Sequence, residues 1–305
     1  MRRFEHTEAK ELRSFDDVKV KKMNDIIEVM HLEKESLGGL HNIVKLNKYE
    51  YMIKDTGEIK EYVKSENRGQ NIAGLKRTFK KIRDLINNNF VGASNELHIT
   101  LTYAENMQDT KKLYKDFDKF MKRFKYRYKH DIDYLAVVEP QGRGAWHFHL
   151  LLRFNGLDKI YIPNDDIADL WGNGFTHTDS LQGIDNIGAY LSAYLGDIEV
   201  SEETVNDMFV NGRYKNVEVK EVEKDGITKK FIKGGRLHYY PPGMNIYRKS
   251  KGIKFPSEQH MKFSDVKKIV GSAQPTFSRT VVIKDPATDR IFNEITYQSY
   301  NLKRL

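Results

Sequence analysis

The sequence contains no cysteine among its 305 residues. Disulfides, thiolate zinc sites and cysteine nucleophiles are thereby excluded, so a metal ion can be bound only by histidine, carboxylate or backbone oxygen. No segment approaches the ~18 consecutive apolar residues of a membrane-spanning helix. The first residues are charged where a signal peptide needs an apolar core, so we expect a cytoplasmic protein with no membrane partner.

The sequence also lacks internal repeats, low-complexity tracts and a phosphate-binding loop of the Gly-x-x-x-x-Gly-Lys-Ser/Thr type. The nearest match runs from Gly69 to Gly74, but Leu75 and Lys76 stand where the motif needs lysine and a hydroxyl. Any ATP-driven separation of nucleic-acid strands would therefore have to come from a separate helicase.

Positive charge is in excess: 51 Lys and Arg residues stand against 43 Asp and Glu residues, for a net charge of +8. The basic residues are clustered, which favours a polyanionic partner such as nucleic acid. Many basic proteins bind no polyanion, so composition alone leaves this question open.

Charge patterns and turn signals divide the chain into three parts. These are a basic hairpin and helix region over 1–90, a core over 91–200, and a basic, aromatic extension over 201–305. The core has the order strand, helix, strand, strand, which is typical of an α+β domain with a central antiparallel sheet and helices packed on it. Its strands are expected over 98–103, 134–139, 145–154 and 175–179, and its helices over 110–129, 165–171 and 185–196.

Basic residues in the two flanking parts are candidates for binding DNA. In the first part a hairpin over 49–63 precedes a helix over 71–87. The polar face of this helix carries Lys76, Lys80 and Arg83, and contact with phosphates and simple solvation explain it equally well. In the third part an exposed hairpin over 217–230 is expected, and the candidate DNA-binding residues that follow are Arg248, Lys249 and Lys251.

The segment from Trp146 to Leu152 alternates apolar residues with two histidines, as a strand with one buried face does. His147 and His149 then project side by side, about 7 Å apart, from a rigid sheet and can converge on one divalent ion. Glu139, at the end of the preceding strand, is placed to add a carboxylate. This ligand set, with an open position for a phosphate oxygen, favours Mg²⁺ or Mn²⁺. A His-x-His pair alone is a weak motif, so two structural histidines remain the alternative.

Tyr190 and Tyr194 lie four residues apart in a segment expected to be helical, so their side chains share one helix face. Such a pair is by itself more often structural than catalytic. The order of a threonine-rich strand, then His-x-His, then the tyrosines favours catalysis. A phenol has a pKa of about 10, so a tyrosine attacks a phosphodiester only if its proton is removed and the phosphorus atom is made more electrophilic. A metal ion bound to the phosphate oxygens achieves the second effect. The product is a phosphotyrosine ester with a free 3′-OH, and the broken bond can be remade without ATP.

Three segments, over 98–103, 138–152 and 190–194, resemble the ordered motifs of the HUH endonucleases. The branch that they resemble comprises the rolling-circle replication-associated proteins of Gram-positive plasmids and phages, which are similar to the filamentous-phage gene II proteins. The resemblance covers the core and extends more loosely to 236–245. It implies a ferredoxin- or RRM-like antiparallel sheet that carries the metal, and Tyr190 as the first nucleophile. It also implies single-stranded or hairpin origin DNA as substrate, a 5′-phosphotyrosine link, and a separate host helicase and polymerase as partners.

The chain departs from the family pattern Tyr-x-x-Lys-Tyr-x-x-Lys, because Ala193 and Asp197 occupy the lysine positions. Arg143, or a basic residue of the third part, would then have to orient the phosphate. Conjugative relaxases and single-strand transposases use the same chemistry and remain alternatives, although such transposases are shorter and relaxases usually carry three histidines. A DNA-binding regulator without enzymatic activity is the alternative from another class.

Overall fold

The structure is a computed structural model that describes residues 3–34, 43–62, 72–141, 144–196, 198–200, 219–224, 227–232, 236, 239–241 and 243–304. Two compact units are present, one made of residues 1–64 and 256–305 and the other of residues 65–255. The boundaries differ from the three parts expected from the sequence. The two ends of the chain share one unit, and the helix expected over 71–87 belongs to the unit that contains the core.

The larger unit is built on a five-stranded sheet in the order β10-β7-β9-β8-β14, in which all neighbouring strands are antiparallel. The strands are β7 (Glu96–Thr102), β8 (Ile132–Pro140), β9 (Trp146–Phe154), β10 (Thr176–Ser180) and β14 (Tyr247–Lys249). The predicted α+β fold with a central antiparallel sheet is thus confirmed. Four of the strands were expected from the sequence, and β14 joins them from the third part of the chain by pairing with β8.

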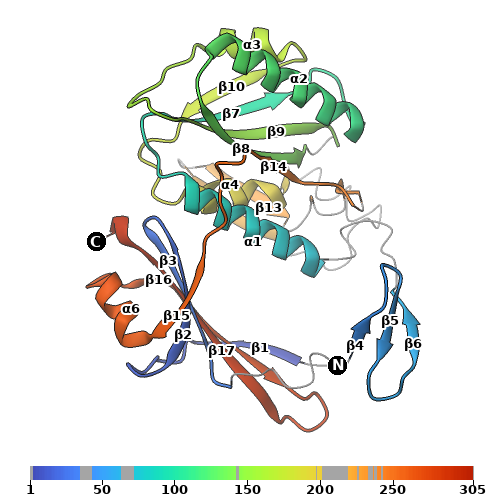
Figure 1. The fold of residues 1–305 in the computed structure, drawn as a ribbon, viewed down its shortest axis with the longest axis vertical. Coiled ribbons are helices and arrows are strands. Elements are labelled where there is room, and N and C mark those ends of the chain that lie inside the picture. The colour runs from blue at the N-terminus through green and yellow to red at the C-terminus, as the bar shows by residue number, and fades with distance from the viewer. Residues whose placement is uncertain are drawn as a thin grey trace. The chain divides into compact units, whose positions relative to one another are not determined.

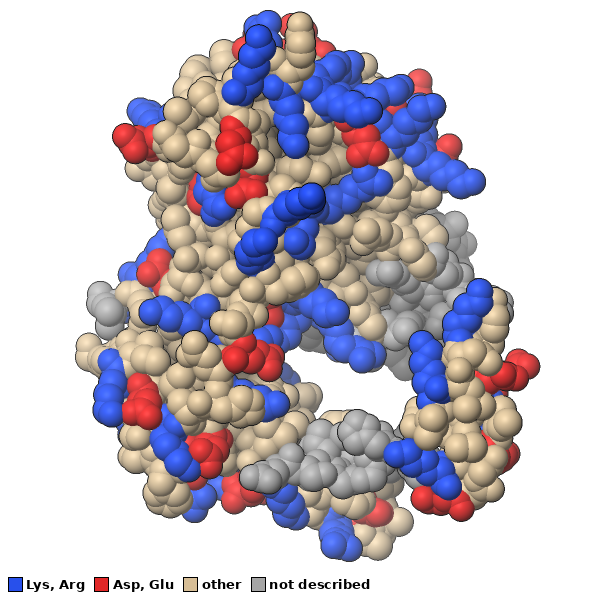
Figure 2. All heavy atoms as spheres, viewed as in Figure 1, with Lys and Arg blue, Asp and Glu red and all other residues tan. Residues whose placement is uncertain are grey.

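Helices α2 (Thr110–Tyr128) and α3 (Asn164–Trp171) cover one face of this sheet (Figure 1). Asp109 caps α2 by accepting hydrogen bonds from the backbone of its first turn. One side of α2 is apolar and buried, and Phe117 stacks on Phe148 of β9 with ring centroids 4.6 Å apart. The three phenylalanines of α2, Phe117, Phe120 and Phe124, therefore belong to the core. The basic residues of α2 face outward, where Figure 2 shows Lys and Arg side chains gathered over α2.

Helices α1 (Ile72–Asn89) and α4 (Ile187–Gly196) lie on the opposite side of the sheet from α2 (Figure 1). Arg153 of β9 connects the sheet to α1 by donating to the Asn89 carbonyl oxygen at 2.6 Å. Helix α4 packs against α1. Two asparagines cap the first turn of α4, since Asn186 accepts from the Ala189 amide and Asn87 of α1 accepts from the Gly188 amide, both at 2.9 Å.

The hairpin expected over 217–230 is confirmed by the antiparallel pair β12 (Val219–Lys224) and β13 (Ile227–Ile232). Its predicted turn, over 225–226, lies outside the described residues. Strand β11 (Ile198–Val200) pairs with the other edge of β13 and completes a three-stranded sheet.

The smaller unit contains a six-stranded antiparallel sheet that the local sequence patterns did not predict. Its order is β1-β16-β17-β3-β2-β15. The strands are β1 (Arg3–Thr7), β2 (Asp17–Met23), β3 (Ile26–Leu32), β15 (Glu258–Lys262), β16 (Pro275–Lys284) and β17 (Ile291–Asn301). Helix α6 (Phe263–Val270) buries its apolar side with residues of β2 and β3 such as Val20 and Val29. Both ends of the chain are thus needed to complete one core.

A separate three-stranded sheet contains β4 (Ile43–Lys45), β5 (Glu50–Ile53) and β6 (Ile59–Glu61). Strands β5 and β6 pair antiparallel with Tyr51 opposite Lys60, which confirms the first predicted hairpin. In the described parts of the chain, no helix combines the length and the apolar character needed to cross a lipid bilayer.

Candidate functional site

Three side chains converge on the face of the five-stranded sheet that is turned away from α2. Strands β8 and β9 pair so that Glu139 lies directly opposite His147, and His149 follows on the same face two residues later. Between the histidines, Phe148 points the other way and is fully buried. The strand alternation predicted from the sequence is therefore present, and it directs both imidazoles to one side of a rigid sheet.

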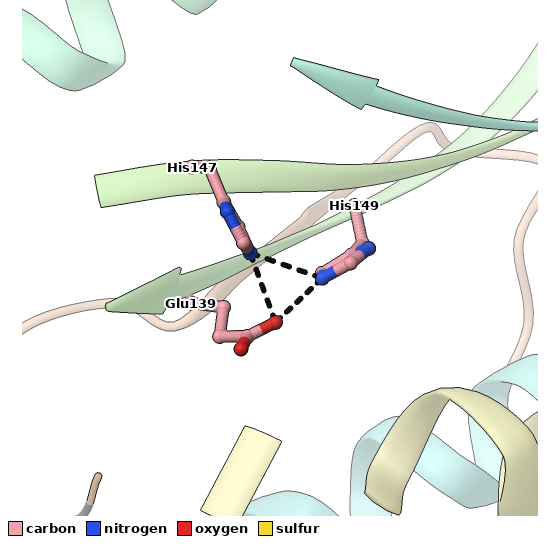
Figure 3. A group of neighbouring side chains, drawn as sticks. All are labelled: Glu139, His147 and His149. Atoms are coloured by element: carbon pink, nitrogen blue, oxygen red, sulfur yellow. Dashed lines mark hydrogen bonds and ion pairs between the residues drawn. The ribbon is translucent and has the colours of Figure 1, made fainter. Parts of the chain in front are cut away.

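The three side chains point toward one another (Figure 3). Oε2 of Glu139 lies 2.9 Å from Nε2 of His147 and 2.5 Å from Nε2 of His149. The two imidazole Nε2 atoms are 3.1 Å apart. Three potential ligand atoms, two nitrogens and one oxygen, are thus directed at one point in space.

This group can hold a metal ion. Ligand atoms at right angles around an ion with bonds of ~2.1 Å lie about 3 Å apart, which matches two of the three separations. The ligand atoms come from one side only, so such an ion would keep positions for water or a phosphate oxygen. Imidazole nitrogen with carboxylate oxygen is a donor set that several divalent ions accept, so the donors alone do not identify the ion.

Electrostatics favours a charged Glu139 beside a neutral His147. Burial alone would raise the pKa of Glu139, but the hydrogen bonds from His147 and His149 lower this pKa to about 2. Burial lowers the pKa of His147, and the neighbouring Glu139 offsets that effect only in part. An ionised carboxylate and neutral imidazoles are the forms that bind metal ions.

Arg236 is a site residue that the sequence patterns did not single out. Its Nη1 lies 2.6 Å from Oε1 of Glu139, the carboxylate oxygen that does not contact the histidines, and also donates to the Pro140 carbonyl. The two oxygens of Glu139 are therefore engaged by different partners, which fixes the orientation of the carboxylate. No local signal marks this role, because Arg236 is 97 positions after Glu139 in the chain.

His98 of β7 also belongs to the site. It is buried, and its Nε2 lies 3.0 Å from Nδ1 of His149. Burial, together with the neighbouring His149, lowers the pKa of His98 to about 3. The alternation of β7 carries a usable signal, since His98, Thr100 and Thr102 share the polar face that pairs with the histidine face of β9.

Tyr190 is the fourth residue of α4. This helix lies on the opposite side of the sheet from α2 (Figure 1), which is the side of the three converging side chains. Its side chain is 42% exposed, so it is accessible from solvent. The predicted partner Tyr194 lies in the same helix, but its side chain is outside the described part of the structure. Arg143 and Asp197 are also outside the described residues. Helix α4 contacts β8, the strand that carries Glu139.

The candidate DNA-binding cations that the structure describes lie on more than one side of the sheet. Lys76 is exposed on α1, where Lys80 pairs with Asp84 of the same helix at 3.2 Å. Arg83 is half-buried.

On β14, by contrast, Arg248 forms an ion pair with Asp118 of α2 at 2.5 Å, and Lys249 donates to the Ile253 carbonyl. Arg248 thus lies on the α2 side of the sheet, away from the α1 cations, while Lys251 is exposed after the strand.

The larger unit thus combines two features. Its antiparallel sheet carries a histidine pair and a carboxylate, and a helix with a tyrosine lies on the same side of that sheet. Residues 96–199, from the start of β7 through α4, match the model of a family of replication-associated proteins, the ORF2 and gene II protein family. The matched segment includes Glu139, His147, His149 and Tyr190. No curated protein is similar enough to the chain to count as a match. The family match supports a replication initiator role.

Proposed function

We propose that the protein is a rolling-circle replication initiator of the HUH endonuclease type, which nicks single-stranded DNA at an origin and later rejoins it. The observation that carries this proposal is the convergence of Glu139, His147 and His149 on one point, on the same side of the sheet as the helix of Tyr190. The family match over residues 96–199 supports the same role. Gram-positive plasmids or phages are the proposed origin of the gene.

In the nicking step, the phenolic oxygen of Tyr190 bonds to the phosphorus of a DNA phosphodiester, and the bond from phosphorus to the 3′ oxygen breaks. The phenol loses its proton and the departing 3′ oxygen gains one, so the products are a 5′-phosphotyrosine link and a free 3′-OH. A bound Mg²⁺ or Mn²⁺ would polarise the phosphate and stabilise its developing negative charge. One phosphodiester replaces another, so rejoining needs no ATP.

The protein residues hold the reacting groups in place. Glu139, His147 and His149 provide the ligand atoms, and Arg236 keeps the Glu139 carboxylate from rotating. The cap from Asn87 holds the first turn of α4, the helix that carries Tyr190, against α1. Tyr194, one turn further along α4, is proposed to attack the regenerated junction after a round of DNA synthesis.

A nicking assay on supercoiled plasmid that carries the protein's own origin tests this function. Wild-type protein is expected to open the plasmid when Mg²⁺ or Mn²⁺ is present and to leave it closed in excess EDTA. Glu139→Gln is expected to abolish nicking but to keep DNA binding, because binding depends on basic residues. Full nicking in EDTA would exclude the metal mechanism. A plasmid that stays closed under all conditions would favour the non-enzymatic DNA-binding regulator.

Mass spectrometry of the protein–oligonucleotide adduct after proteolysis tests the tyrosine assignment. Tyr190→Phe is expected to form no adduct with single-stranded DNA, whereas Tyr194→Phe forms the adduct but fails in the closing transfer. A nucleotide found only on Tyr194 would reverse the assignment. A wild-type adduct on neither tyrosine would exclude the tyrosine mechanism. The DNA sequence that is cleaved would separate an origin nickase from a conjugative relaxase or a single-strand transposase, which share this chemistry.

A further inference from the structure

The two histidines of the candidate metal site differ at their second ring nitrogen. Nδ1 of His149 lies 3.0 Å from Nε2 of His98, and the two rings stack with centroids 5.2 Å apart and planes at 21°. Nδ1 of His147 is buried, and no described residue bonds to it. One ligand is therefore held by a second imidazole and the other is not.

A chain of polar groups continues from His98 to the edge of the sheet. Strand β10 pairs with β7 so that Asp179 lies opposite His98. Nδ1 of His98 is 3.8 Å from Oδ2 of Asp179, whose other oxygen lies 2.9 Å from Nε2 of His177. The order of groups from the site outward is thus His149, His98, Asp179 and His177.

Two imidazole nitrogens 3.0 Å apart need one proton between them, so one ring donates and the other accepts. Nε2 of His149 faces Glu139. In the tautomer in which this nitrogen donates to Glu139, Nδ1 of His149 accepts from His98. When Nε2 gives its lone pair to a cation, Nδ1 carries the ring proton and donates to His98. His98 then carries its own proton on Nδ1, which faces the Asp179 carboxylate.

We propose that His98, supported by Asp179, is a positioning residue that sets which nitrogen of His149 carries the ring proton. In the cation-bound protein this pair keeps Nε2 of His149 unprotonated and directed at the ion. The role rests on the cation site of the proposed function. His98 itself contacts neither the cation nor the DNA. Hydrogen-bonding groups behind a ligand histidine commonly orient the ring and raise its affinity for the metal.

The ring protons can be observed directly in the full-length protein labelled with ¹⁵N on histidine. Two-bond ¹H–¹⁵N correlation spectra report the protonated nitrogen of each ring, with and without Mg²⁺. In wild-type protein, saturating Mg²⁺ is expected to move the His149 proton from Nε2 to Nδ1, and the His98 proton from Nε2 to Nδ1. His98→Phe keeps a stacking ring but removes the hydrogen bond, so His149 is expected to show a mixture of both forms.

Cation affinity is the second measurement, by titration with Mn²⁺ followed by electron paramagnetic resonance. His98→Phe is expected to weaken Mn²⁺ binding roughly 10- to 100-fold, and Asp179→Asn by about threefold to tenfold. His98→Gln can still donate and accept, so it is expected to recover most of the loss. His130→Phe, an exposed histidine elsewhere in the larger unit, is the matched control and is expected to bind Mn²⁺ as wild type does.

The outcomes separate the positioning role from the proposed function. Wild-type protein that binds no Mn²⁺ would overturn the cation site, and with it the nicking mechanism. Wild-type affinity and a wild-type His149 spectrum in His98→Phe would overturn only the role of His98. If Mg²⁺ shifts the signal of His98 Nε2 and His149 Nδ1 carries no proton, His98 is itself a ligand of the ion. That result would also overturn the positioning role of His98. If His98→Phe does not fold, Asp179→Asn provides the test, because the Asp179 side chain is 46% exposed. Unchanged Mn²⁺ affinity in Asp179→Asn would then overturn the role of His98.

Discussion

The side-chain oxygen of Asn87 in α1 accepts a hydrogen bond from the Gly188 amide in the first turn of α4, at 2.9 Å. A Cβ atom added at Gly188 would lie 2.4 Å from that same oxygen. The bond is therefore possible only because residue 188 has no side chain. Because Gly188 stands two positions before Tyr190, this contact holds the start of the helix that carries the proposed nucleophile against α1.

Gly188→Ala is expected to shift α4 and to slow formation of the covalent DNA adduct, by as much as ~10²-fold for a shift of about 1 Å. Mn²⁺ affinity should stay unchanged, because the metal ligands are on the sheet. Ala189→Ser, at an exposed neighbouring position, is the control. The double variant Asn87→Ala with Gly188→Ala should be less impaired than the sum of its single variants, because the first change makes room for the second. Additive losses would argue against the contact.

Gly174→Ala is expected to destabilise the larger unit. Gly174 has a φ of +150°, and a Cβ there would lie 2.3 Å from the Ala104 amide nitrogen and 2.6 Å from the Thr102 carbonyl oxygen. The strain alone costs about 1–3 kcal/mol, and the backbone clash adds to it. Each kcal/mol lowers the unfolding temperature by about 2–4 °C in a domain of this size. Gly156 has a φ of +78°, and a Cβ atom added there would meet no atom within 4 Å. Gly156→Ala therefore measures backbone strain without a clash and should lower the unfolding temperature less.

Divalent cations are expected to stabilise the wild-type protein against heat, because a ligand that binds only the folded state adds about 2.7 kcal/mol at a hundredfold excess over its Kd. Differential scanning calorimetry in increasing Mg²⁺ or Mn²⁺ would measure this effect. His149→Ala and Glu139→Gln should abolish it, because each removes a ligand atom. Glu105→Gln, an exposed acidic residue, should respond as wild type does. An equal shift in His149→Ala would place the cation elsewhere.

Asp133 makes the stability of the larger unit depend on pH. Burial raises the pKa of Asp133, but hydrogen bonds from Ser250, Arg153 and Asn155 outweigh burial and lower it. A carboxylate whose folded pKa is below its unfolded value of about 3.9 stabilises the folded state above that pH. This stabilisation is lost as the pH falls through the folded pKa.

Asp133→Asn should therefore lower the free energy of unfolding by about 1–3 kcal/mol at pH 7, where charged hydrogen bonds are lost. The difference from wild type should shrink as the pH falls below about 4. Urea denaturation of both proteins at pH 7 and at pH 3 measures the difference in their free energies of unfolding at each pH. The exposed Asp158→Asn is the control. A difference that does not change with pH would show that the charge of Asp133 contributes nothing.

DNA affinity is expected to fall steeply with salt, and the exposed Lys76 should contribute more to this dependence than the paired Arg248. Replacing Lys76 by Ala should flatten the slope of log K against log salt by about 0.7 on single-stranded DNA. Arg248→Ala should flatten it less, because Asp118 already compensates the charge at 2.5 Å. Lys76→Arg keeps the charge and should keep the slope. A binding constant that does not respond to salt would contradict the role of these cations.

Residue patterns along the chain were enough to predict those parts of the fold that depend on near neighbours. Alternation in β9 placed His147 and His149 on one face, because side-chain direction repeats every two residues in a strand. The hairpins β5–β6 and β12–β13 followed for the same reason, since their strands are joined by short turns.

Contacts between distant segments follow from the folded chain and from no local pattern. Strand β1 pairs with β16 across almost the whole chain, and Arg236 reaches Glu139 from beyond the hairpin β12–β13. The contacts of His98 with His149 and of Asn87 with Gly188 likewise join separate elements. Such pairings depend on which surfaces are buried together when the chain closes long loops, and a local pattern of residue types contains no information about which distant partner a strand or side chain will meet.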